Sequence, residues 1–162
     1  MLISKNMNAA VNKPVGNEMH ASHTYLAMSC CFAGMGLMIF ASRFRKQSDE
    51  ERVHSLKIVD YIHDVGGSVV FDAVVKPKAE YSSVRAIVKA AVDSEMTVTA
   101  QINQLVALAD KENDYATRSF LGWFVDEQVE EVSSMTELLQ LVTMAGESNL
   151  FQLENRLTQA MS

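Results

Sequence analysis

The sequence predicts an all-α fold, an antiparallel four-helix bundle with one long crossover connection. Three observations lead to this prediction. Apolar residues recur in four segments at alternating spacings of three and four, the period of a buried helix face. Only two prolines and seven glycines interrupt the 162 residues, and 48% of the residues are hydrophobic. We therefore expect residues 1–162 to form a single folded domain with a substantial core.

Each of the four segments carries a stripe of residues on one predicted helix face. The stripes are Val11, Val15, Glu18, Ser22, Tyr25, Ser29 and Phe32; Phe40, Phe44, Gln47, Glu51, His54, Ile58, Tyr61 and Val65; Val84, Val88, Ala91, Glu95, Val98, Ile102, Leu105 and Ala109; and Phe124, Gln128, Glu131, Met135, Leu138 and Val142. One carboxylate interrupts each stripe near its middle. A single such residue is most simply a side chain reaching the rim of the bundle, but four form a pattern.

The spacing of these carboxylates around the predicted turns places them in matched pairs. In the first hairpin, Glu18 lies 17 residues before Met35 and Glu51 lies 16 residues after it. In the second hairpin, the two stripe glutamates each lie 18 residues from Asn113. Because a helix rises about 1.5 Å per residue, the two acids of an antiparallel hairpin stand at one level.

The crossover is predicted between residues 66 and 81, a stretch that contains Pro77 and has no helical period. Such a stretch, if extended, reaches about 50 Å, enough to run alongside a helix of about 25 residues. The third helix then runs parallel to the second, and the two acid pairs meet in the middle of the bundle.

Four buried carboxylates without counter-charge would have to take up protons. No lysine or arginine stands near them on the stripes, so a pair of divalent cations is the natural compensation. His54 follows Glu51 by three residues and projects from the same helix face. Mixed carboxylate and imidazole ligands suit iron or manganese, and the lack of a thiolate ligand disfavours structural zinc.

Further candidates flank this set of ligands. Gln128 could order a metal-bound water or dioxygen, or it could form a hydrogen bond across the core. Tyr25 could bind a ligand or donate an electron, or it could be an ordinary core residue. Glu50, Glu127 and Glu130 form either a third, more exposed metal site or a solvated acidic face.

Charge and composition exclude other classes of protein. A net charge of −6 disfavours nucleic-acid binding, which needs a clustered basic face. Cys30 and Cys31 are adjacent and make neither a disulfide framework nor a zinc site; we expect them to be buried, in a reducing cytoplasmic setting. The N-terminus has no signal-peptide pattern. Residues 24–42 lack charge, but Gly34 and Gly36 interrupt them, so we expect no membrane span.

The chain resembles the bacterial non-haem ferritins over nearly its whole length. The residues that carry the resemblance are 17–25 (NEMHASHTY), 50–54 (EERVH), Glu95, and 123–131 (WFVDEQVEE). It implies a ferritin-like bundle over residues 7–144 or so, followed by a short fifth helix over about 147–160 that lines the fourfold axes of a cage. Leu150, Leu153 and Leu157 of that helix would pack either on symmetry mates or on their own bundle.

The resemblance also implies roles for the acids. Glu18, Glu51 and His54 would hold one iron, and Glu51 would bridge to a second iron. The second iron would be held by Glu95 and Glu131.

The resemblance also implies roles for the residues around these ligands. Gln128 would support the ligands from behind, and Tyr25 would lie beside the iron pair. The third iron site of this branch of the family would be formed by Glu50, Glu127 and Glu130.

The implied activity is oxidation of Fe²⁺ by dioxygen or peroxide, with ferric mineral stored in a homo-oligomeric cage of 24 subunits. Haem is not expected, because Arg52 stands where bacterioferritins have a haem-ligating methionine and the fourth helix lacks a second Glu-x-x-His. A di-iron oxidoreductase that stores no iron, such as a rubrerythrin-like peroxidase, is the alternative. A purely structural helical assembly is a third hypothesis.

The first predicted helix is the least regular. Pro14 precedes Glu18 by about one turn and Gly16 lies between them, and proline lacks the N–H that an internal helix position donates. Either the helix kinks there, or it begins near Pro14 with Asn12 as its N-cap.

Overall fold

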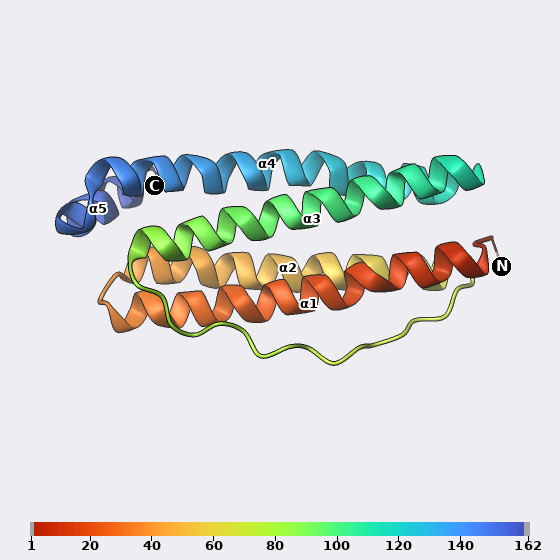
Figure 1. Ribbon diagram of the computed structural model, residues 1–162, viewed down its shortest axis with the longest axis horizontal. Coiled ribbons are helices and arrows are strands. Elements are labelled where there is room, and N and C mark those ends of the chain that lie inside the picture. Colours follow the sequence, from red (N-terminus) through yellow and green to blue (C-terminus); the bar gives the residue numbers. More distant parts are fainter. Residues whose placement is uncertain (1, 161–162) are drawn as a thin grey trace.

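The computed structural model describes residues 2–160, with side chains through residue 158. Its elements are α1 (Lys5–Gly34), α2 (Met38–Asp64), α3 (Val84–Glu112), α4 (Tyr115–Ala145), a 3₁₀ turn η1 (Glu147–Asn149) and α5 (Leu150–Ala160). Within the described residues there is no β-strand. Four long helices lie side by side and α5 packs at one end of them (Figure 1). The predicted all-α bundle with a short fifth helix is confirmed.

The connection between the two hairpins runs the length of the molecule. Residues 65–83 have no regular structure and pass as an extended segment from the end of α2 to the start of α3 (Figure 1). As a result, α2 and α3 begin at the same end of the bundle and run in the same direction. The predicted crossover is therefore present, and it brings the middles of both hairpins together.

The apolar core is divided into two clusters, one toward each end of the bundle. One cluster contains residues from all five helices, among them Phe32, Phe40, Val88, Leu138 and Leu150. The other contains residues from the four long helices, among them Val11, Ile58, Ile102 and Phe124. None of the four stripe glutamates belongs to either cluster. The polar layer at mid-bundle is thus enclosed by apolar packing on both sides.

Helix α1 runs through Pro14 without ending. It begins at Lys5, where the Ser4 side chain caps it by accepting a hydrogen bond from the Met7 N–H at 2.9 Å. A helix start near Pro14 is therefore wrong. Asn12 does not cap; its Oδ1 accepts from the Val70 N–H of the connector at 2.6 Å. The buried face formed by residues such as Met7 and Pro14 stabilises the helix despite the missing donor.

Helix α2 obtains its N-terminal cap from a distant segment. Its N-cap residue, Leu37, makes no side-chain cap hydrogen bond. Oε1 of Glu154, on α5, accepts from the Ile39 and Phe40 N–H groups at 2.7 and 3.0 Å. Glu154 is only 7% exposed, and Leu153 beside it is also buried. Helix α5 is therefore docked on its own bundle by apolar packing and by this buried carboxylate.

The expected burial of the two cysteines is wrong. Cys30 is exposed and Cys31 is half-buried, and both are free thiols. At this level of α1 the core face is occupied by Met28, Ser29 and Phe32, so the cysteines project to the sides. The Cys31 Sγ lies 3.1 Å from the carbonyl oxygen of Ala79 in the connector. Among residues 2–160, no helix combines the length and apolar character that a membrane crossing requires.

Candidate metal centre

The four stripe glutamates and His54 are buried at the middle of the bundle. Each long helix contributes one glutamate, and α2 also contributes the histidine. The exposed fractions are 2% for Glu18, Glu51 and Glu95, 6% for His54 and 8% for Glu131. The sequence spacing that placed these residues at one level is thus reflected in the structure, which brings all five of them together.

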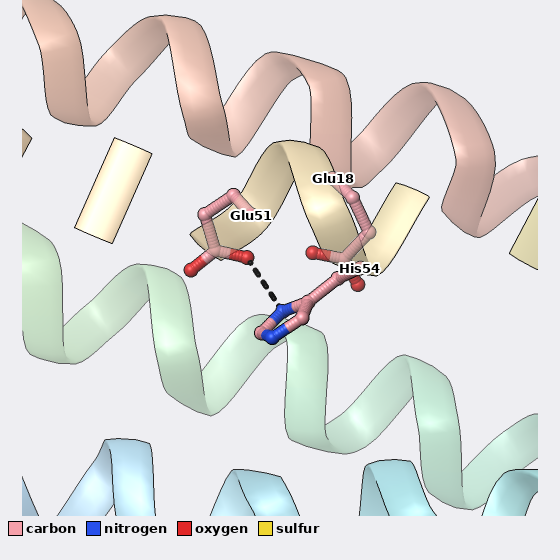
Figure 2. Close-up of side chains that lie close together, drawn as sticks. All are labelled: Glu18, Glu51 and His54. Atoms are coloured by element: carbon pink, nitrogen blue, oxygen red, sulfur yellow. Dashed lines mark hydrogen bonds and ion pairs between the residues drawn. The ribbon is translucent and has the colours of Figure 1, made fainter. Parts of the chain in front are cut away.

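The ligand atoms form two neighbouring groups of three. Glu18, Glu51 and His54 offer oxygen and nitrogen atoms that lie within 4.8 Å of one another (Figure 2). Glu51, Glu95 and Glu131 form a second group by the same measure. Because Glu51 belongs to both groups, the two lie next to each other.

His54 is fixed between acids and aromatic rings. Its Nδ1 lies 3.3 Å from Oε2 of Glu51, the contact drawn in Figure 2. Its Nε2 lies 4.0 Å from Oε1 of Glu127. The Trp123 and Phe124 rings pack edge-on to the imidazole, with centroid distances of 5.3 and 6.2 Å. These contacts fix the orientation of the imidazole among the acids.

Tyr25 and Gln128 both contact the second group. The Tyr25 hydroxyl is buried and donates to Oε1 of Glu95. The Gln128 amide donates to Oε2 of Glu131 at 2.5 Å and to Oε2 of Glu95 at 3.4 Å. Thr99 in turn donates to the Gln128 carbonyl oxygen at 2.9 Å, which fixes the amide orientation. Of the alternatives open for Gln128, the hydrogen bond across the core is present.

Gln47 also belongs to the centre, although it was not predicted as a site residue from the sequence. Its Nε2 donates to Oε1 of Glu51 and to Oε1 of Glu131, both at 2.9 Å. The available signal was its place on the second stripe, one helical turn before Glu51. A polar residue on an apolar stripe beside a core acid is a candidate of the same kind as Gln128.

Burial is the main cause of the raised pKa values of three acids in the cluster. Desolvation raises the pKa of Glu18 well above its ordinary value, and the nearby Glu51 carboxylate raises it further. Burial, followed by repulsion from Glu51 and Glu95, raises the pKa of Glu131 to about 9. Burial likewise raises the pKa of Glu95. These acids hold protons unless a cation replaces them.

Glu51 is the acid of the cluster that favours its charged form. Burial alone would raise its pKa, but hydrogen bonds with His54, Glu18 and Gln47 bring the pKa below the ordinary value. The carboxylate common to both ligand groups is therefore the one most readily ionised, as a shared metal ligand requires.

The residues present fit a pair of divalent cations. Oε2 of Glu18 is buried and has no hydrogen-bond partner, an arrangement that is costly unless a cation takes the place of a donor. In the described part of the chain, no lysine or arginine forms an ion pair with any of the four acids. Carboxylate oxygens with one imidazole are a donor set that suits Fe²⁺ or Mn²⁺.

The three outer acids do not form one group. Glu127 joins His54 and Glu131 in a third set of atoms within 4.8 Å of one another. Glu50 instead pairs with Lys46 at 3.3 Å, and its side chain is 44% exposed. Glu130 is also exposed. The structure thus links Glu127 to the buried centre and leaves the other two on the surface beside it.

A crossed-over bundle with a glutamate from each helix at one level defines the carboxylate class of four-helix bundles. The family model of the ferritin-like domain matches residues 8–145. This chain belongs to the ferritin-like family. It is 39% identical to a bacterial non-heme ferritin of Staphylococcus epidermidis over 146 residues, covering 90% of this chain and 88% of that protein. It is 38% identical to one from Staphylococcus aureus, covering 91% and 89%.

Solved structures agree with this assignment. An open-pore ferritin from the hyperthermophilic archaeon Archaeoglobus fulgidus superimposes with a TM-score of 0.93 at 35% sequence identity. The match covers 96% of both chains. A humanized archaeal ferritin superimposes equally well, with 34% identity.

Proposed function

We propose that this protein oxidises Fe²⁺ at the buried carboxylate centre and stores the ferric product. The observation that carries the proposal is the pair of buried three-ligand groups that share Glu51, with which no lysine or arginine among the described side chains forms an ion pair. The names of the curated relatives, bacterial non-heme ferritins, support the same class of activity.

In this proposal iron is the substrate, and the ligand residues are divided between two ions. Glu18, Glu51 and His54 bind one Fe²⁺, and Glu51, Glu95 and Glu131 bind the other. Anionic oxygen ligands favour the ferric over the ferrous ion, which makes each iron easier to oxidise. Two neighbouring ferrous ions can supply two electrons to one oxidant: two Fe²⁺, dioxygen and two protons give two Fe³⁺ and hydrogen peroxide. Peroxide is the alternative oxidant.

The residues around the centre hold its carboxylates in position. Gln128 fixes Glu95 and Glu131 through its amide, and Tyr25 holds Glu95 from the other side, close enough to supply an electron. Glu127 lies beside the buried centre, and its side chain is 32% exposed. We propose that the exposed Glu50 and Glu130 join Glu127 in a third, outer iron site only when an ion draws them together.

Storage requires an enclosed volume that one helical bundle does not provide. We propose a homo-oligomeric cage of 24 subunits in the cytoplasm, with α5 near the symmetry axes. The match over nearly the full length of an open-pore ferritin and the docked fifth helix support this arrangement.

Substituting the shared ligand tests the catalytic part of the proposal. Glu51→Ala removes one ligand from both groups, so aerobic Fe²⁺ oxidation should slow at least about tenfold, as expected when a directly acting group is lost. The initial rate is followed by absorbance of the ferric product. Glu80→Ala, an exposed acid of the connector, is the matched control. An unchanged rate in Glu51→Ala, with a normal control, removes the catalytic assignment.

A further inference from the structure

Gln47 differs from the other residues of the centre because it spans the two hairpins. It lies on α2 one turn before Glu51, and its amide reaches Glu131 on α4 as well as Glu51. A primary amide carries two N–H donors. Each of them is directed at a different carboxylate, with both distances at 2.9 Å.

The chemistry of the contact determines which end of the amide faces the acids. When both acids are ionised, as they are as metal ligands, an inward-facing carbonyl oxygen would meet only acceptors and negative charge, so the NH₂ group points inward. A neutral donor suits this position. A lysine here would also satisfy both oxygens, but its charge would repel cations entering the centre.

The two ligand groups depend on this contact to different degrees. Glu51 keeps a second partner at its other oxygen, because Nδ1 of His54 lies 3.3 Å from Oε2. Glu131 accepts from two amides, Gln47 at Oε1 and Gln128 at Oε2, and Nδ1 of His54 lies 4.0 Å from its Oε1. Glu131 is a ligand of the second group and not of the first, whereas Glu51 is common to both.

We propose that Gln47 is a positioning residue of the second metal subsite, which is formed by Glu51, Glu95 and Glu131. Its amide holds Glu51 and Glu131 in position relative to each other across the two hairpins. The inference rests on the proposed function, since it assumes that the centre binds metal. Gln47 acts through the carboxylates and not through contact with an ion. Loss of the amide therefore leaves the first subsite, formed by Glu18, Glu51 and His54, nearly unchanged.

Anaerobic titration calorimetry with Co²⁺, which is not oxidised under these conditions, tests the proposal on the assembled protein. Two reference variants assign the binding steps: Glu18→Gln alters a ligand of the first subsite alone, and Glu95→Gln a ligand of the second alone. Gln47→Leu has a similar volume and no amide. Gln47→Met, which is unbranched and flexible, replaces it if the leucine variant does not fold. Gln140→Leu, an exposed glutamine on α4, is the matched control.

We expect Gln47→Leu to weaken the step assigned to the second subsite by roughly tenfold, the effect of losing a hydrogen bond to a charged group. The step assigned to the first subsite should stay within about twofold of wild type, and Gln140→Leu should change neither. Equal weakening of both steps, or no weakening of either, would overturn the role of Gln47 alone. No saturable Co²⁺ step in the wild-type protein would overturn the proposed function, and this inference with it.

Discussion

The side chains of the metal centre are acids whose protonation is controlled by their depth in the bundle. Burial raises the pKa of Glu18, Glu95 and Glu131, and only Glu51 has a lowered pKa, because its hydrogen bonds outweigh the desolvation. At neutral pH a folded chain without metal therefore carries protons that the unfolded chain has already released. This difference makes the stability of the apoprotein depend on pH.

Glu131 gives the clearest case. Its pKa rises from an ordinary 4.5 to about 9 on folding. Its contribution is thus favourable below pH 4.5 and is lost as the pH rises toward 9, at up to about 1.4 kcal/mol per pH unit. We expect the free energy of unfolding of the apoprotein, measured with urea in the presence of a chelator, to fall between pH 5 and 9.

The variant Glu131→Gln keeps the shape of the side chain and removes the titrating group. Its stability should vary less steeply with pH over the same window, measured by the same urea titrations. A wild-type profile that is flat from pH 5 to 9, or one that rises, would contradict this account of the buried acids.

Among the four long helices, α2 is distinguished by having no local side-chain cap, so that its cap comes from another element. The starts of α1, α3 and α4 are capped locally by Ser4, Ser83 and Asp114. Glu147 of η1 also accepts from the first amides of α3, but there it supplements Ser83. The start of α2 is capped by Glu154, which also holds α5 on the bundle. The two elements are therefore coupled: the first turn of α2 has its acceptor only while α5 is docked.

Removing that acceptor should loosen both elements. In Glu154→Ala the N–H groups of Ile39 and Phe40 lose their partner, so the free energy of unfolding should fall by about 1–2 kcal/mol, the cost of a lost helix cap. Amide exchange at Ile39 and Phe40 should quicken, while exchange at Val88 in the core of α3 stays slow. Glu154→Gln retains an acceptor and should lose less. Unchanged exchange at both amides in the alanine variant would show that Glu154 is not their cap.

For the whole molecule, the proposal of storage predicts a large particle with a high capacity for iron. Light scattering should give the mass of about 24 chains, and aerobic loading should take up far more iron per chain than two three-ligand groups can bind. A small oligomer that retains only a few irons per chain would contradict storage and favour the di-iron oxidoreductase. Chains of Glu51→Ala should assemble normally, because Glu51 lies inside the bundle.

Most of what could be predicted about the fold and the site from the sequence follows from local helical periodicity. Helical spacing placed Glu18, Glu51, Glu95 and Glu131 on inward faces at one level, because height along a helix depends only on residue number. The cap that Glu154 gives to α2 was not predictable, since it joins residues 115 positions apart.

The contacts of Gln47 were missed for a similar reason, as they depend on how side chains of two helices meet. Pro14 was misleading because its local penalty is outweighed by packing along the whole of α1. The cysteines were misjudged because residue type is a poor guide to which side of a helix faces the core.

The cap on α2 also has a consequence for the order in which parts of the protein fold during synthesis. A ribosome makes Glu154 after every residue of the four bundle helices, so the nascent first hairpin emerges without the acceptor for Ile39 and Phe40. Those two amides gain the Glu154 acceptor only after α5 has been synthesised and has folded back on the bundle. A chain interrupted before residue 154 therefore lacks the acceptor for the first turn of α2.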